Sequence, residues 1–271
     1  MSKQMDILAR RKVKDKIVNI VYLILPVLSI SLLILLWVAA SGGDNSMFPS
    51  PKATLDRLVV LSQKPIMKLN LFQHVMISLY RVLTALGAAW ILGIAFGIML
   101  GWNKKFNAFF GPIFEGFRSI PPIAWIPLIT IWFGIGEFPK IVIVFIGAIS
   151  PVVVNTKAGM SNIDSIYLDA SRVFNANQRQ QLFEIAIPSA IPAIFAGIRT
   201  STSTGWMVVL AAEMLGAKSG VGFLIVRGMQ SGDMPLILVA MITIGIVGAI
   251  LAIVTQFVER LVCPWTAKAS N

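Results

Sequence analysis

The sequence contains little charge, one cysteine and one histidine. Asp, Glu, Lys and Arg make up only 13% of its 271 residues, whereas soluble domains carry about 25%. Cys263 has no second cysteine with which to form an intramolecular disulfide, and His74 alone cannot build a Cys/His zinc cluster. The motifs HExxH, CxxC and GxSxG are absent as well. We therefore expect no metal site and no catalytic residues of the common protease or hydrolase types.

Apolar residues dominate what is present. They make up 56% of the chain, and the mean hydropathy is +0.81. These values are typical of an integral membrane protein. The net charge of +11 could indicate a nucleic-acid partner, but the Lys and Arg residues lie mainly beside apolar runs. In that position they set the topology and contact anionic membrane lipid, so we expect no nucleic-acid binding.

The apolar runs predict an all-α protein with six membrane-spanning helices in one membrane domain, residues 17–262. We place the spans at about residues 17–40, 75–101, 106–133, 138–158, 188–212 and 234–258. Most Lys and Arg residues then fall on the side of the basic N-terminus, residues 1–16, and the C-terminal tail, residues 263–271. The positive-inside rule makes both termini cytoplasmic. A cleaved signal peptide ending near Ala40 is the alternative for the first run.

Two of the predicted spans carry features beyond hydropathy. In the second, Gly93, Gly97 and Gly101 form a small-xxx-small ridge, which predicts close approach of another helix. The third is interrupted by four prolines, at positions 112, 121, 122 and 127. Broken backbone in a membrane is tolerated only inside protein or beside a cavity, so this span is predicted to border a pathway. Glu115 and Arg118 are spaced to form a local ion pair.

A polar segment, residues 161–187, separates the fourth and fifth spans. Asp164 can cap a first short helix, and Asn175 can adopt the left-handed turn that ends it. A second helix is predicted over Gln178–Ala186, stopped by Pro188.

Small residues, Ala170 and Ser171, are expected at the exposed bend of this segment. Two short helices joined at a corner would then form a plug for a groove on another protein.

The same segment carries a family pattern. Asp169-Ala170-Ser171 stands where the pattern has Glu-Ala-Ala, Asn175 stands for its Gly, and Ile185, Ile187 and Pro188 stand for its Ile-x-Leu-Pro end. The segment resembles the EAA loop of permease subunits of binding-protein-dependent ABC importers. The stretches SIPPIAWIPLITIWFGIGEFPK and FAGIRTSTSTGWMVVLAAEM are similar to the sulfonate, taurine, nitrate and bicarbonate branch of those permeases.

The resemblance implies a type I ABC importer permease fold with six transmembrane helices, in the bacterial cytoplasmic (inner) membrane. It implies a homodimer that works with two ATPase subunits inside and a periplasmic or lipid-anchored substrate-binding protein outside. The cargo would be a small oxyanion such as a sulfonate, taurine, nitrate or bicarbonate. The residues that would dock the ATPase are Tyr167, Leu168, Asp169, Ala170, Ser171, Arg172, Val173, Phe174 and Asn175.

No ATPase activity is expected of the chain itself. GAKSG resembles the end of a phosphate-binding loop, but it lacks the Gly directly before Lys218, and no strand precedes it. ATP and Mg would therefore be bound by the partner subunits, with no cofactor in this chain.

The fifth span contains the candidate pathway residues. Arg199 lies eleven residues past Pro188, roughly 16 Å along a helix and so near the middle of the bilayer. An Arg there requires protein, water or a partner charge. Thr202, Ser203 and Trp206 follow on the same helical face, which could pass an oxyanion. The alternative is a structural Arg tied to Glu115 or Glu213.

A secondary transporter driven by an ion gradient is the alternative function. The number of spans, the large polar segment and the lack of visible inverted halves disfavour it.

Overall fold

The computed structural model describes residues 22, 24–42 and 48–264. The predicted cytoplasmic N-terminus, the beginning of the first span and the tail beyond residue 264 lie outside the described residues. Within them the regular structure is helical apart from an isolated bridge between Ile66 and Leu69. The prediction of an all-α protein is confirmed.

The described helices follow one another along the chain with short connections. A helix over Ile24–Ala40 is followed by α2 (Pro51–Gln63), α3 (Leu71–Trp102), α4 (Lys104–Arg118), a 3₁₀ turn (Pro122–Trp125), α5 (Ile126–Phe133), α6 (Glu137–Ser161), α7 (Ser165–Val173), α8 (Gln178–Gln180), a π-helical turn (Gln181–Ala186), α9 (Ile187–Met214), α10 (Val221–Ser231) and α11 (Met234–Val262).

Long apolar helices form the membrane part of the structure. Among the described residues, α3, α6, α11 and the continuous helix Gln178–Met214 are long and apolar enough to cross a membrane. Ile24–Ala40 and Pro122–Phe133 are shorter apolar helices. The protein is therefore a multi-pass membrane protein. The six spans predicted from the sequence overlap these four long helices and two shorter ones, and the bounds of the spans stay a prediction.

α6 packs along both α3 and α9 and forms the centre of the bundle. The glycine ridge of α3 makes the first of these contacts possible. A Cβ atom added at Gly97 would lie 2.6 Å from the Thr156 Cβ, and one at Gly101 would lie 2.4 Å from the Met160 Cβ, both on α6. Only residues without a side chain allow this approach, so the predicted packing role of the ridge is confirmed.

The third apolar segment is broken at Pro121 and Pro122, as predicted, but Pro112 lies inside α4 and does not interrupt it, contrary to the prediction. α4 ends at Arg118, and the chain resumes with the 3₁₀ turn and the eight-residue α5. Pro122 and Pro127 stand at the first positions of these elements, where a backbone N–H is not required. The ion pair between Glu115 and Arg118 forms on the exposed side of α4.

The prediction that Pro188 ends a helix is wrong, because one helix runs continuously from Gln178 to Met214. A π-helical turn precedes the proline, and the Ile187 N–H donates to the Leu182 carbonyl, five residues back. The wider turn changes the bonding just before a residue that lacks an N–H, so the helix continues. The second part of the polar segment and the fifth span therefore form one continuous helix, Gln178–Met214, roughly 55 Å long at the usual rise per residue.

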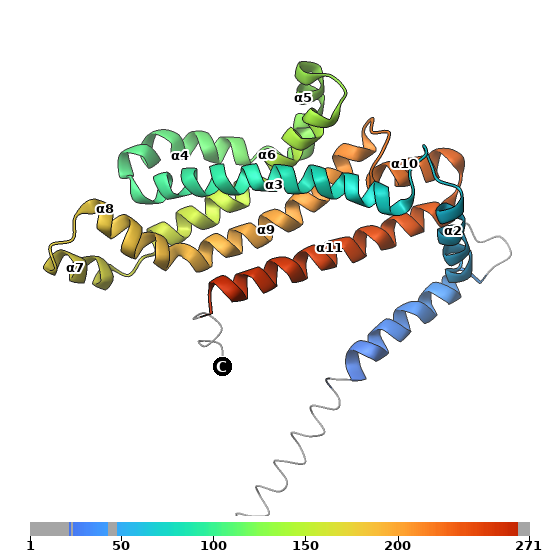
Figure 1. The fold of residues 1–271 in the computed structure, drawn as a ribbon, viewed down its shortest axis with the longest axis horizontal. Helices are drawn as coiled ribbons and strands as arrows, with labels where there is room; N and C mark the ends of the chain where they lie inside the picture. Colours follow the sequence, from blue (N-terminus) through green and yellow to red (C-terminus); the bar gives the residue numbers. More distant parts are fainter. Residues whose placement is uncertain (1–21, 23, 43–47, 265–271) are drawn as a thin grey trace, which may run out of the picture.

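The bundle has two distinct ends (Figure 1). α7 and α8 lie together at one end, and α2 and α10 lie at the other. The helix Ile24–Ala40 leaves the bundle near α2, and its apolar side chains are largely exposed.

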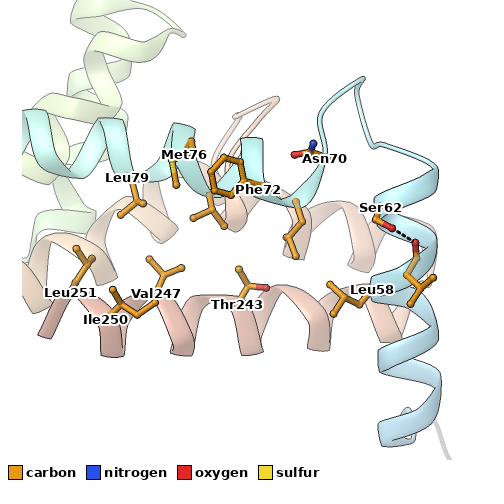
Figure 2. A pocket seen from close by; sticks show the side chains of 13 residues that line it. Leu58, Ser62, Asn70, Phe72, Met76, Leu79, Thr243, Val247, Ile250 and Leu251 are labelled. Carbon is orange, nitrogen blue, oxygen red and sulfur yellow. Dashed lines mark hydrogen bonds between the residues drawn. The ribbon is translucent and has the colours of Figure 1, made fainter. Parts of the chain in front are cut away.

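An apolar groove with a volume of about 800 Å³ lies between α2, α3 and α11 (Figure 2). Leu58, Phe72 and Val247 are among the side chains that line it. Such surfaces face lipid or another membrane helix.

Candidate functional site

α7 is a short helix at one end of the bundle, and capping residues define both of its ends. The Asp164 carboxylate accepts a hydrogen bond from the Ile166 N–H at 3.0 Å. At the other end Asn175 adopts φ +58°, the left-handed conformation that Asn tolerates better than most residues. The capping residues predicted for this helix are confirmed.

The end of α7 presents apolar side chains to the outside. Val173 is 81% exposed and Phe174 is 85% exposed, while Ile166 and Tyr167 are exposed one to two turns earlier. Asp169 and Arg172 form an exposed ion pair at 2.7 Å on the same helix. Side chains of this kind, gathered on a helix that projects from the protein, indicate a surface for another protein.

Ser171 does not lie at the exposed bend, contrary to the prediction. It is buried, its hydroxyl donates to the Leu168 carbonyl at 2.7 Å, and its own carbonyl accepts from the Ala176 N–H at 2.9 Å. These bonds tie the turn after α7 back onto the helix. Ala170 is the small residue exposed there.

Arg199 pairs with neither of the carboxylates suggested from the sequence. Its guanidinium forms an ion pair with Glu259 of α11. Glu115 pairs with Arg118, and Glu213 pairs with Arg81. The Arg199 side chain remains 47% exposed, so it lies at the surface of the single chain and not in its core.

The other three candidate pathway residues are brought together. Thr202, Ser203 and Trp206 line a pocket of about 170 Å³ with residues of α11. The Thr202 hydroxyl donates to the Ile198 carbonyl at 2.8 Å, and the Trp206 indole donates to the Ile244 carbonyl at 3.1 Å. Arg199 is not among the residues that line this pocket.

An ionic cluster lies toward the end of the bundle that carries α10, with Glu213 buried and Glu137 55% exposed. Arg81 of α3 is fully buried. Its Nε and Nη2 donate to the two carboxylate oxygens of Glu137 at 2.6 and 2.8 Å, and its Nη1 donates to Glu213 at 2.6 Å. Nη1 and Nη2 also donate to the carbonyl and hydroxyl of Ser219. One guanidinium therefore joins α3, α6, α9 and the loop before α10.

Side chains of α3 and α9 cap the N-terminus of α10. The N–H groups of Gly220, Val221 and Gly222 donate in turn to the His74 Nδ1, the Ser78 hydroxyl and the Glu213 carboxylate, at 3.1, 2.9 and 2.9 Å. A carboxylate at this position is favoured by the helix dipole.

His74 also contacts the loop after α2. Because its Nδ1 accepts from Gly220, Nε2 carries the proton and faces the Ile66 carbonyl at 3.3 Å. The lone histidine of the chain thus joins two loops at this end of the bundle.

Arg81 falls within the predicted second span, residues 75–101, and the sequence shows no partner for it. Its carboxylates lie 56 and 132 residues further along the chain. An arginine in an apolar run is itself a signal that a partner exists, because an unpaired charge in the membrane is costly. Periodicity does not indicate which carboxylate that partner is.

Long apolar helices, a broken segment beside the bundle and a short helix, α7, with exposed apolar side chains are the features expected of the membrane subunit of a transport complex. The family model described as "Binding-protein-dependent transport system inner membrane component" matches residues 93–268. The chain belongs to this family, whose members are permeases that work with ATPase subunits and a binding protein.

Curated relatives are similar over most of their length. The nitrate import permease protein NrtB of Synechocystis sp. is 35% identical, and the match covers 90% of each chain. The taurine transport system permease protein TauC of Escherichia coli is 31% identical over 80% of this chain and 79% of its own. The bicarbonate transport system permease protein CmpB of Synechococcus elongatus is 30% identical over 88% of each.

The fold agrees with that of a solved ABC transporter. The chain matches a structure of the MetNI methionine ABC transporter in an inward-facing conformation with a TM-score of 0.61. The match covers 71% of this chain and 95% of the other, at 21% identity. The predicted type I importer fold and the predicted permease branch are confirmed.

Proposed function

We propose that the chain is the membrane pathway for a small oxyanion in an ABC importer of a bacterial cytoplasmic membrane. The observation that carries the proposal is the similarity over most of the chain to permeases named for nitrate, taurine and bicarbonate. These cargoes are all small and carry a planar or tetrahedral group of oxygens. Two copies would form the pathway, with two ATPase subunits inside and a periplasmic or lipid-anchored binding protein outside.

The ATPase subunits bind ATP and Mg in this proposal and contact the permease at α7. The exposed apolar residues Val173 and Phe174 support the assignment, as does their position between two membrane-spanning helices. Closure of the ATPases on ATP would draw the docked α7 helices together, and the spans would turn the cavity outward.

Uptake into liposomes by the purified complex identifies the cargo and the energy source. Liposomes with the complex and its loaded binding protein should take up one of nitrate, taurine, an alkanesulfonate or bicarbonate only when ATP is present on the ATPase side. Uptake driven by an ion gradient without ATP would support a secondary transporter instead.

Arg199 is the proposed cation of the pathway, one turn from the pocket of Thr202, Ser203 and Trp206. Arg199→Gln removes the guanidinium, whose planar set of donors suits an oxyanion. We expect uptake to fall by about tenfold, the equivalent of one charge-assisted hydrogen bond in the transport step. ATPase co-purification should not change, because the side chain is half exposed and outside the core.

Glu259→Gln is the matched control, since it removes the partner of Arg199 and leaves the cation in place. It should retain most of the uptake. Equal loss of assembled complex in both variants would show that the Arg199–Glu259 pair is structural and would contradict a role in the pathway.

The proposed topology places α7 inside and the loop before α10 outside, with both termini cytoplasmic. Cysteines at the exposed positions Lys218 and Arg179 test it in a Cys263→Ser background. Burial, together with the nearby Glu259 carboxylate, raises the pKa of the Cys263 thiol, so the native residue itself should react slowly. An impermeant maleimide added to whole cells should label Lys218→Cys and not Arg179→Cys. The reverse pattern would reject the topology.

A further inference from the structure

α6 and α9 flank the docking segment at one end of the bundle and meet at Arg81 at the other. α6 ends at Ser161, four residues before α7 begins, and the continuous helix that contains α9 starts at Gln178, soon after α7 ends. At the far ends, Glu137 is the first residue of α6 and Glu213 is the last but one of α9. Both carboxylates bind the same guanidinium.

We propose that Arg81 is a positioning residue that holds α6 and α9 together at the end opposite α7. A movement imposed on α7 then reaches the far end because the two helices move as one rigid body. Without the contacts of Arg81, α6 and α9 separate at their far ends and part of the movement is lost. This inference rests on the proposed function, because it assumes that α7 is the helix that the ATPase moves.

The geometry of the cluster is suited to holding two helices at a set distance. Arg81 uses one edge of its guanidinium for both oxygens of Glu137 and the remaining donors for Glu213 and Ser219. Such a planar fork fixes orientation as well as distance. Lys140 adds a second cation on Glu137 at 3.1 Å, so two cations and two carboxylates balance in charge.

Packing alone would not produce the same constraint. Apolar residues of similar volume can stabilise a buried site as well as an ion pair does. They can also slide past one another, whereas an arginine held between two carboxylates has one set of partners. Small residues between α6 and α9, such as Gly147 against Val208 and Gly159 against Ala193, allow close packing along the helices. Apolar residues near the far ends, such as Ile143 and Ala212, belong to the same buried core, and the ionic cluster adds a directional contact to that packing.

The cluster is also hydrogen-bonded to the N-terminus of α10 and to the loop before it. Glu213 and Ser78, which cap α10, are hydrogen-bonded to each other at 2.7 Å, and Glu213 binds Arg81. The loop before α10 is held by Arg81 through Ser219. A rigid movement of α6 and α9 therefore moves the surface built by α10 and by the beginning of α6, where the proposed topology puts the binding protein.

The test must distinguish the loss of the contacts that Arg81 makes from the cost of leaving a buried carboxylate unpaired. Arg81→Met alone leaves Glu213 buried without a cation, so the main variant is Arg81→Met combined with Glu213→Gln, which removes both charges. Glu137 keeps Lys140 as its partner. The matched control is Arg57→Met with Asp233→Asn, which removes an ion pair between α2 and the N-cap of α11. Asn still caps that helix.

Each variant complex is purified with its ATPase, placed in nanodiscs and normalised to assembled complex. Two quantities are measured: hydrogen exchange of residues 214–222, and the stimulation of ATPase activity by the loaded binding protein. We expect the main variant to assemble within about twofold of the wild type. Its exchange should accelerate by about tenfold, as expected when a charge-assisted hydrogen bond is lost. Stimulation and uptake should fall by a similar factor while basal ATPase activity stays near normal. The control should resemble the wild type throughout.

Normal stimulation and uptake in the main variant would overturn the proposal, even if exchange were faster. If the main variant assembled poorly, Arg81→Lys would take its place, since it keeps the charge and loses the fork. Normal coupling in Arg81→Lys would equally overturn the role. Failure of the wild type to retain any ATPase would overturn the proposed function instead, and hydrogen exchange would still report whether Arg81 holds the far ends together.

Discussion

Gly220→Ala is expected to destabilise the assembled transporter by at least about 3 kcal/mol. Gly220 has φ +107° and ψ 168°, a region of backbone conformation that is essentially restricted to glycine. An added Cβ would also lie 2.3 Å from the carboxyl carbon of Glu213. The methyl group must displace that carboxylate, and with it the bonds from Arg81, Ser78 and Gly222.

Gly216→Ala is the control for this substitution. Gly216 also has a positive φ, +83°, but nothing lies within 4 Å of the position that its Cβ would take. Gly216→Ala should lower the stability of the complex by about 1 kcal/mol through backbone strain, and it should leave the ionic contacts intact. The thermal midpoint and the yield of monodisperse complex in detergent measure both variants. If Gly220→Ala were as stable as Gly216→Ala, the ionic cluster would contribute little to stability.

Phe174→Asp is expected to weaken the retention of ATPase subunits by at least about 30-fold. Phe174 is the C-cap residue of α7, directly follows Val173 and is 85% exposed. Exposed aromatic residues on a helix that docks into a groove are typical hot spots of an interface. The aspartate loses that apolar contact and also requires a carboxylate to be desolvated in the partner's groove.

Gln178→Asp is the matched control, because it adds the same charge four residues later at an exposed polar position. The measurement is the amount of ATPase that co-purifies with a tagged permease, with permease abundance in the membrane as the reference. Both variants should insert normally, since neither side chain is buried. Full retention of the ATPase by Phe174→Asp would contradict docking at α7.

The agreement between sequence and structure is closest where the cause is local. Asp164 caps α7 and Asn175 ends it through bonds and backbone angles within a few residues. Pro121 and Pro122 break the third segment for the same kind of reason, whereas Pro112 lies inside α4. Pro188 shows the limit of such inference, because the π-helical turn before it allowed the helix to continue.

Two side chains were not placed correctly from the sequence. Ser171 was expected to be exposed, and pairing of Arg199 with Glu115 or Glu213 was the structural alternative to its role in the pathway. In the structure Ser171 is buried and Arg199 pairs with Glu259, 60 residues away. Sequence spacing carries no information on which of several carboxylates approaches a given cation.

By itself, the sequence determined that this is a helical membrane protein, which runs are apolar enough to form long helices, and that the glycine ridge of α3 admits a close helix neighbour. Hydropathy, glycine spacing and caps act over a few residues, so they can be read along the chain. Only the tertiary structure decided that Arg81 joins Glu137 and Glu213, and that His74 and Ser78 cap α10. Those contacts depend on how α3, α6 and α9 are arranged in three dimensions, and the helix packing that brings the buried charges together leaves no periodic pattern in the sequence.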